Sequence, residues 1–181
     1  FEPFVHVAEE RTFTTKDSYS CDWRVGKDNP YVKPKKLSGV TVCVGRADHL
    51  RQTLAHNVKL LDELVVVTTV DDQETIDVVR ANEGAKLVLS DACYIHYHSF
   101  NLGEMQNAGL ARLAPGHDWI TFFTCDVFLP DDLPTFVKGF TLNPGILFGA
   151  PRDDIKDGVI LPKKEVDLQP NGYFQMWHPN A

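Results

Sequence analysis

The sequence has no long hydrophobic run, and this lack argues against a membrane-spanning helix. A helix needs about 20 consecutive apolar residues to cross a bilayer, and no stretch of the 181 residues approaches that length. The opening segment, FEPFVHVAEERTF, carries charges where a secretory signal needs an apolar core, so we expect no signal peptide. The chain starts at Phe1 and not at Met, as a processed product or an excised piece of a longer protein would.

Glycine-rich phosphate-binding motifs are also missing. Without a GxGxxG motif the dinucleotide fingerprint is excluded, and without GxxxxGKS/T a P-loop kinase or ATPase is disfavoured. Basic residues are scarce, since 18 Lys and Arg stand against 25 Asp and Glu, giving a net charge of −7 at pH 7. Because binding along DNA or RNA depends on a basic face, we expect no extended nucleic acid as a partner.

Cysteine is present but forms no short-spaced motif. The four cysteines stand at positions 21, 43, 93 and 125, without a CxxC or a short Cys/His pattern. This spacing disfavours a zinc site and favours a reducing, cytoplasmic setting. His96 and His98 would point the same way in an extended segment, but no third ligand lies nearby in the sequence, so the pair is a weak metal candidate.

Apolar runs alternate with helical patterns over residues 39–150. The runs predict strands at 40–44, 64–69, 85–90, 119–124 and 146–150, and the spacing of apolar residues predicts helices at 47–61, 72–83 and 102–113. This alternation predicts one Rossmann-like α/β domain with a mostly parallel sheet and right-handed crossovers. We expect an N-terminal arm and linker over residues 1–38 and the domain itself over residues 39–181.

Polar residues follow the predicted strands, where open α/β sheets bind their ligands. Val44, Gly45 and Arg46 follow the first strand, and the Arg46 guanidinium is a candidate phosphate or base partner. Gly45 as a plain turn and Arg46 as a surface residue form the alternative. After the second strand, one of Asp71 and Asp72 is expected to cap the next helix and the other to bind a ribose or base.

Further polar positions and one glycine complete this set. Asp91 follows the third strand, and Asn101 with Glu104 resembles a helix capping box. The most informative segment is DWITFFTCDVFLPDDL, a buried strand that ends at Asp126 before Leu-Pro turns the chain away. Gly109 weakens a helix interior, so close packing or close ligand approach is expected there.

The stretch FNLGEMQNAGLARLAPGHDWITFFTCDVFLPDDL resembles the family-2 glycosyltransferases of the GT-A fold. Their pattern is F-N-K-G-x-x-x-N-x-G-L, a short loop, and then W-I-x-x-x-D-x-D-x-x-L-P. The resemblance covers residues 39–150 and extends to the terminal GYFQMWHP. Two positions depart from the pattern, because Thr124 replaces the first aspartate of D-x-D and Leu102 replaces the lysine.

The resemblance implies a metal-dependent, inverting transfer of a sugar from a nucleoside-diphosphate sugar, with UDP favoured, to a glycan or other hydroxyl acceptor. Asp126, helped by His178, would hold Mn²⁺ or Mg²⁺. The donor would contact the strand-end residues together with Asn101, Gly103, Asn107, Thr124 and Cys125. Asp153 and Asp154 are candidates for the carboxylate base, with an acidic surface loop as the alternative.

The terminal aromatic segment offers an acceptor wall. Tyr173, Gln175 and Trp177 would face the acceptor, because aromatic faces stack on sugar rings. The alternative is that these side chains complete the hydrophobic core. In this family the base often lies further downstream, so the chain is also consistent with a C-terminal truncation.

Three hypotheses therefore compete. The first is an active glycosyltransferase, and the second is a catalytically degenerate sugar- or nucleotide-binding module or fragment. The third is a sugar nucleotidyltransferase, which shares the α/β plan. Fold alone does not separate the three.

Overall fold

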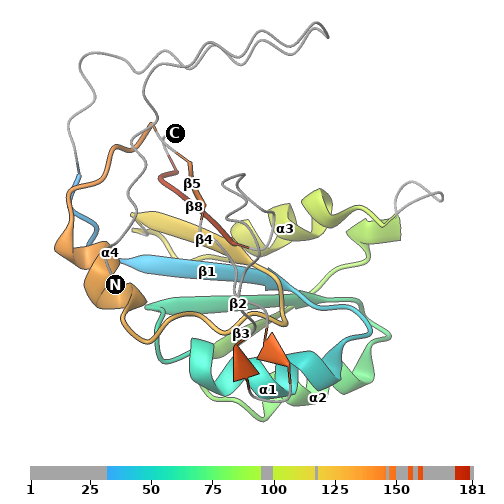
Figure 1. Cartoon of the computed structure of the whole chain (residues 1–181). Coiled ribbons are helices and arrows are strands. Elements are labelled where there is room, and N and C mark those ends of the chain that lie inside the picture. The colour runs from blue at the N-terminus through green and yellow to red at the C-terminus, as the bar shows by residue number, and fades with distance from the viewer. Residues whose placement is uncertain are drawn as a thin grey trace, which may run out of the picture.

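Apolar, largely β-branched runs form the central strands of a computed structural model of the chain. The structure describes residues 32–94, 100–116, 118–145, 147–149, 155–156, 159–160 and 174–179. Six strands make one sheet in the order β3-β2-β1-β4-β8-β5 (Figure 1). They are β1 (Leu37–Val42), β2 (Glu63–Thr68), β3 (Ala85–Leu89), β4 (Trp119–Phe123), β5 (Phe148–Gly149) and β8 (Phe174–Trp177).

The first four strands are parallel, whereas β8 runs antiparallel to both of its neighbours, β4 and β5. A separate two-stranded hairpin joins β6 (Ile155–Lys156) and β7 (Val159–Ile160). Strands β2 and β4 are buried along their whole length, as expected for a parallel sheet covered on both faces. The predicted Rossmann-like α/β architecture, with a mostly parallel sheet flanked by helices, is confirmed.

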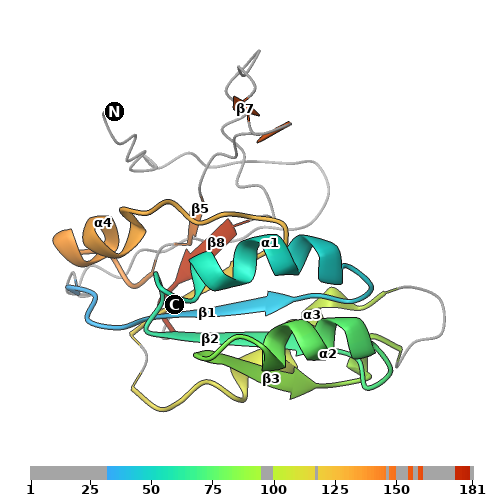
Figure 2. The same ribbon diagram turned by 90° about the horizontal axis from the view of Figure 1, so that it is seen from below.

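Helices cover both faces of the sheet. Helices α1 (Ala47–Asn57) and α2 (Gln73–Arg80) pack on one face through a core cluster that includes Leu50, Leu54 and Val79. Helix α3 (Leu102–Leu110) packs on the other face, where Met105 is buried against the sheet (Figures 1 and 2). A 3₁₀ turn (Ala92–Tyr94) and α4 (Leu133–Gly139) complete the helices of the described part. None of these helices is long and apolar enough to cross a bilayer.

Close packing explains two glycines. A Cβ on Gly109 of α3 would lie 2.5 Å from Val40 Cγ1 and 2.8 Å from Val67 Cγ2. A Cβ on Gly39 of β1 would lie 2.5 Å from Leu61 Cδ1. Of the two explanations predicted for Gly109, close helix-to-sheet packing is therefore the one observed.

The structure corrects several predicted boundaries and adds one strand, β8. Strand β1 begins at Leu37, whereas the sequence predicted a start at residue 40. Helix α1 ends at Asn57, although we expected it to run to residue 61, because a turn there lets Leu61 pack against the sheet. The terminal aromatic segment contains β8, a strand that the alternation of strands and helices did not predict.

The chain leaves β1 and enters β4 on opposite faces of the sheet. Helix α1 follows β1 on one face, and α3 precedes β4 on the other, while β1 and β4 are direct neighbours. Such a reversal of winding opens a crevice at the carboxyl ends of the two strands, where ligands of open α/β sheets bind.

Candidate functional site

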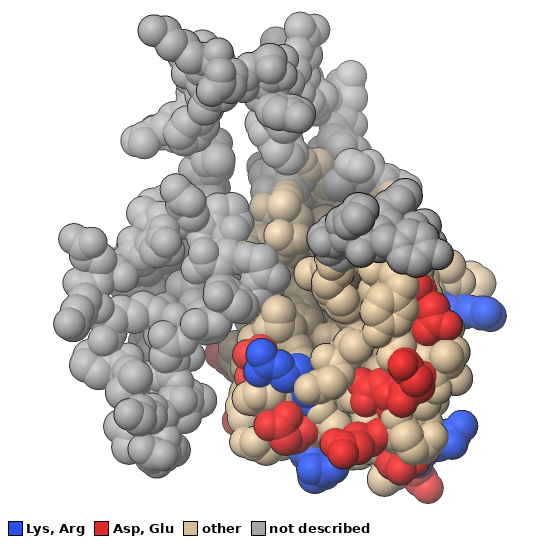
Figure 3. Space-filling view, turned by 90° about the vertical axis from the view of Figure 1, so that its right-hand side faces the viewer, with Lys and Arg blue, Asp and Glu red and all other residues tan. Residues whose placement is uncertain are grey.

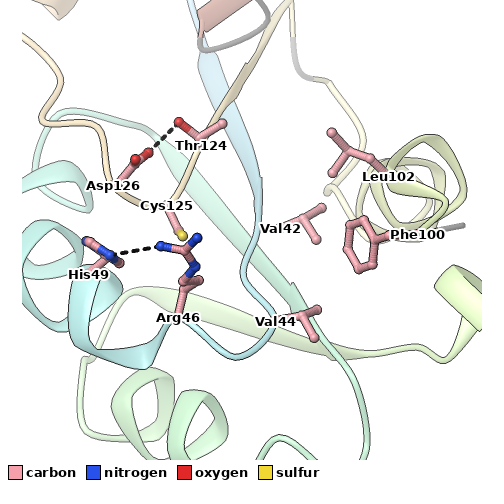
Figure 4. A pocket seen from close by; sticks show the side chains of 9 residues that line it. All are labelled: Val42, Val44, Arg46, His49, Phe100, Leu102, Thr124, Cys125 and Asp126. Atoms are coloured by element: carbon pink, nitrogen blue, oxygen red, sulfur yellow. Dashed lines mark hydrogen bonds between the residues drawn. The ribbon is translucent and has the colours of Figure 1, made fainter.

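A pocket lies at the carboxyl ends of β1 and β4, at the point where the winding of the sheet reverses. Its volume is about 240 Å³, and its lining combines charged and polar side chains with apolar ones. The lining residues, drawn in Figure 4, are Val42, Val44, Arg46, His49, Phe100, Leu102, Thr124, Cys125 and Asp126. Five of them were predicted from the sequence as site residues: Val44, Arg46, Thr124, Cys125 and Asp126.

The first turn of α1 supplies the basic side of the pocket. Arg46 Nη1 and His49 Nε2 are 3.2 Å apart (Figure 4). A guanidinium only donates, so His49 Nε2 accepts and the ring proton lies on Nδ1. Arg46 stands at the N-cap of α1 and its side chain makes no capping bond. The first-turn N–H groups and the remaining guanidinium donors therefore favour an anionic ligand.

Asp126 and Thr124 form the acidic side. Thr124 Oγ1 donates a hydrogen bond of 2.6 Å to Asp126 Oδ1, and Asp126 is exposed (Figure 4). The threonine that replaces an aspartate in the resembling pattern therefore orients the remaining carboxylate. Figure 3 shows the face at which the parallel strands end, where acidic and basic side chains gather below an uncharged area.

Cys125 forms part of the floor between these two sides. Its thiol hydrogen-bonds the thiol of Cys43, and that bond, together with burial, raises the pKa of Cys125. A protonated, buried thiol is a poor nucleophile. Cys125 therefore contributes a neutral surface to the pocket.

Asp72 is occupied by structural bonds. Its carboxylate caps α2 by accepting from Thr75 N at 3.2 Å, and it also accepts from Thr68 Oγ1 at 3.0 Å and from Gly45 N at 2.8 Å. Burial alone would raise its pKa, but the bonds from Gly45, Thr75 and Thr68 outweigh burial and lower it. The expectation that one of the paired aspartates caps the helix is met by Asp72. Gly45 has a positive φ of 64°, which suits the tight turn this bond requires.

Five further predicted donor contacts lie outside the pocket lining. Asp91 Oδ1 accepts from Val70 N at 3.3 Å and ties the loops after β2 and β3 together, while Asp71 is exposed beside it. Asn101 caps α3 by accepting from Glu104 N at 3.2 Å, which confirms the capping prediction. Gly103 and Asn107 are exposed on α3 and do not line the pocket.

The prediction that His178 shares a metal with Asp126 is corrected by the strand pairing. In the antiparallel pair of β4 and β8, Trp177 lies opposite Ile120, near the start of β4. The His178 ring packs against Trp119, with ring centroids 5.6 Å apart. Asp126 follows the carboxyl end of β4, so the His178 and Asp126 side chains lie at opposite ends of that strand.

Strand β8 contains two of the three residues predicted for the acceptor wall, Gln175 and Trp177. Trp177 packs edge to face on Phe122, with ring centroids 4.5 Å apart, as expected for a side chain that completes the core. Gln175 pairs with Phe122 in the register and is half-buried. Tyr173 and the base candidates Asp153 and Asp154 lie outside the described residues, as do His96 and His98.

Four lining residues were not predicted as site residues: Val42, His49, Phe100 and Leu102. His49 was identifiable in principle, because it follows Arg46 by three residues and so shares its helix face. Phe100 and Leu102 are 53% and 42% exposed, which is high for large apolar side chains and favours ligand contact.

The fit of the pocket to a divalent ion depends on Asp126. In the part of the chain that the structure describes, no group of three His, Cys, Asp or Glu side chains is arranged to hold a metal ion. Asp126 is the only carboxylate among the lining residues of this pocket. Mg²⁺ is commonly bound through one or two carboxylates plus substrate phosphates and water, so the donor set fits an ion that arrives with a phosphorylated ligand.

Comparisons with known proteins give a structural likeness and no sequence family. The sequence matches no protein-family model, and no curated protein matches it. The crystal structure of 4-diphosphocytidyl-2C-methyl-D-erythritol synthase from Anaerococcus prevotii DSM 20548 matches with a TM-score of 0.50 and 17% identity, over 80% of this chain and 70% of that one. Rv0371c from Mycobacterium tuberculosis H37Rv matches with a TM-score of 0.38 and 18% identity, over 59% of this chain and 58% of that one. The first likeness supports the Rossmann-like α/β fold, and the second is too low to carry an argument.

Proposed function

We propose that the chain is a glycosyltransferase of GT-A type that binds a nucleoside-diphosphate sugar, with UDP favoured, and transfers the sugar to an acceptor hydroxyl. The observation that carries this proposal is the pocket at the β1/β4 switch point. It brings Arg46, the residue after the first strand, into one cavity with Thr124 and Asp126 from the fourth. The two strand ends were expected to form one site on sequence grounds.

The two sides of the pocket suit the two ends of such a donor. The diphosphate would lie against Arg46, His49 and the uncapped first turn of α1, where a guanidinium and free N–H groups stabilise negative charge. The base or sugar would contact Val44, Phe100 and Leu102, because flat apolar groups stack on such surfaces. Ligand sites of this mixed kind are typical of small-molecule pockets.

Asp126 would hold Mn²⁺ or Mg²⁺ together with the diphosphate. A bound ion supplies Lewis-acid stabilisation of the departing nucleoside diphosphate. The Thr124 hydroxyl keeps Asp126 oriented by its 2.6 Å bond to Oδ1. Deprotonation of the acceptor hydroxyl is assigned to Asp153 or Asp154, as the sequence predicts for an inverting enzyme.

Calorimetric titration with UDP, GDP and CDP and their sugars, with and without Mn²⁺, tests the donor site. We expect one nucleoside diphosphate to bind in a Mn²⁺-dependent manner. Failure of every nucleotide to bind would contradict the proposal and favour the degenerate-module hypothesis.

A nucleotidyltransferase is the second candidate. The likeness to a protein named as a diphosphocytidyl-methylerythritol synthase favours it, although at 17% identity the likeness concerns the fold alone. The products distinguish the two activities, because a glycosyltransferase releases nucleoside diphosphate and a nucleotidyltransferase releases pyrophosphate. Release of pyrophosphate from a nucleoside triphosphate and a sugar phosphate would select this second activity.

A further inference from the structure

Helix α1 turns three polar side chains toward the loop that follows β4. Thr53 and Asn57 are almost fully buried, with exposed fractions of 2% and 1%, and His56 is partly buried beside them. Burying a polar side chain is costly unless it is hydrogen-bonded. These three side chains therefore need hydrogen-bond partners, and the main chain of residues 125–129 supplies them.

The contacts form a continuous series along this loop. Thr53 Oγ1 donates to Cys125 O at 2.6 Å, and Asn57 Nδ2 donates to Val127 O at 2.8 Å. Asn57 Oδ1 also accepts from Leu129 N at 3.0 Å. His56 Nε2 lies 2.7 Å from Leu129 O and must be the donor, because a carbonyl oxygen only accepts.

The bond from Thr53 is the one nearest Asp126. A hydroxyl carries a single hydrogen, and within its own helix Thr53 Oγ1 is 3.4 Å from both His49 O and Leu50 O. The 2.6 Å contact to Cys125 O is much the shorter, so the hydrogen lies on that bond. It fixes the peptide that links Cys125 to Asp126.

One rigid helix thereby sets both sides of the pocket. The first turn of α1 carries Arg46 and His49, and its next turns hold the loop that carries Asp126. The main-chain positions that carry the basic group and the carboxylate are then held relative to each other before a ligand arrives. Such preorganisation lowers the cost of binding a ligand that contacts both.

We infer that Thr53 is a positioning residue for Asp126, acting through the carbonyl of Cys125 to set where a nucleoside diphosphate and its metal ion are bound. This inference rests on the proposed function, since it assigns Thr53 a role in the same site. Thr53 itself does not line the pocket.

Two substitutions separate the hydroxyl from the shape of the side chain. Thr53→Val keeps the branched shape and removes the donor, whereas Thr53→Ser keeps the donor. Because loss of an outer partner of a metal ligand commonly weakens binding about 10- to 100-fold, we expect Thr53→Val to raise the Kd of UDP with Mn²⁺ at least about tenfold. Thr53→Ser should bind UDP like the parent. Thermal unfolding of each variant establishes that it is folded at the temperature of the titration.

A double-mutant cycle with Asp126→Asn provides a readout that a merely structural role would not move. If Thr53 acts by placing the Asp126 carboxylate, Thr53→Val should cause little further loss once that carboxylate is gone. Parental UDP affinity in Thr53→Val, or the same loss in both backgrounds, would overturn the inference and leave the proposed function intact. Absence of binding of UDP, GDP and CDP alike by the parent chain, with Mn²⁺ present, would overturn both.

Discussion

Asp126 is the only carboxylate among the lining residues of the pocket, and it is the simplest residue at which to test the site. We expect Asp126→Ala to leave only a weaker, Mn²⁺-independent binding of UDP to the basic side of the pocket and to abolish any sugar transfer. Because Asp126 is exposed, the free energy of unfolding should change by no more than about 0.5 kcal/mol. Calorimetry and urea unfolding measure the two quantities.

Asp131→Ala is the matched control for this substitution. The Asp131 side chain is 93% exposed, follows the same loop and does not line the pocket. It should bind UDP and Mn²⁺ like the parent. Equal binding by the parent and Asp126→Ala would show that the metal site lies elsewhere.

Position 124 allows the opposite test with a single residue, in which a carboxylate is added instead of removed. A carboxylate at position 124 would stand beside Asp126, because the Thr124 hydroxyl already touches Asp126 Oδ1. Adding a charged oxygen ligand strengthens binding of a hard cation, so we expect Thr124→Asp to tighten Mn²⁺ roughly tenfold. Thr124→Asn, which adds bulk without charge, is the control. Unchanged or weaker Mn²⁺ affinity in Thr124→Asp, measured by titration of the ion, would show that position 124 does not face the metal.

At the scale of elements, the packing of α3 on the sheet depends on Gly109. A methyl group there would meet the stiff, buried side chains of Val40 and Val67 at less than 3 Å. Overpacking costs about 1–3 kcal/mol, whereas alanine gains about 1 kcal/mol in a helix interior. We expect Gly109→Ala to lower the free energy of unfolding by about 0–2 kcal/mol, as measured by urea denaturation.

Gly103→Ala is the control within the same helix. A Cβ on Gly103 would find only Asn101 Oδ1 within 4 Å, at 3.6 Å, so the helix-forming preference of alanine is not opposed. We expect no loss of stability. Greater stability of Gly109→Ala than of the parent would mean that α3 does not pack on β1 and β2 as described.

The same elements show how far the sequence predicts the fold. Strands β2 and β4 were predicted with ends within one residue of those observed, because a fully buried parallel strand is a continuous apolar run. Strand β8 was missed because its position depends on pairing with β4 and β5, which are remote in the sequence. The start of β1 was missed because Gly39 resembles a linker residue. In the structure Gly39 belongs to β1, where the Leu61 side chain lies too close for a Cβ.

The site residues also divide into those that the sequence predicts correctly and those that it does not. Residues at strand ends, such as Arg46 and Asp126, were predictable because the switch point of a parallel sheet gathers strand ends. His178 was misplaced because the direction of β8 determines which edge it reaches, and the sequence carries no signal for that direction. Asp72 was ambiguous because capping and ligand binding require the same carboxylate chemistry.

At the scale of the whole molecule, the buried carboxylate of Glu63 joins segments at the amino ends of the parallel strands. The pocket lies at the other end of the sheet, where these strands have their carboxyl ends. Glu63 Oε2 accepts from Lys36 Nζ at 3.2 Å, and Oε1 accepts from Lys86 Nζ at 2.6 Å. The Ala114 N–H lies 3.0 Å from Glu63 Oε1, which ties in the loop before β4. The Glu63 side chain is only 6% exposed, whereas the Lys86 side chain is 54% exposed, so water reaches these bonds from the lysine end.

Acid unfolding tests this cluster. Burial alone would raise the pKa of Glu63, but the bonds from Lys86, Ala114 and Lys36 outweigh it and lower the pKa below its usual value. A folded pKa below the unfolded value of about 4.3 means that the stabilisation is complete above about pH 5 and is lost as the pH falls through the folded pKa. Glu63→Gln should therefore lose about 1–2 kcal/mol at pH 7 and show a flatter fall in stability below pH 5. Urea denaturation from pH 3 to pH 7 measures both effects, with Glu83→Gln, on an exposed turn, as the control. If Glu63→Gln and the parent lose stability in parallel as the pH falls, the charge on Glu63 does not hold these segments together.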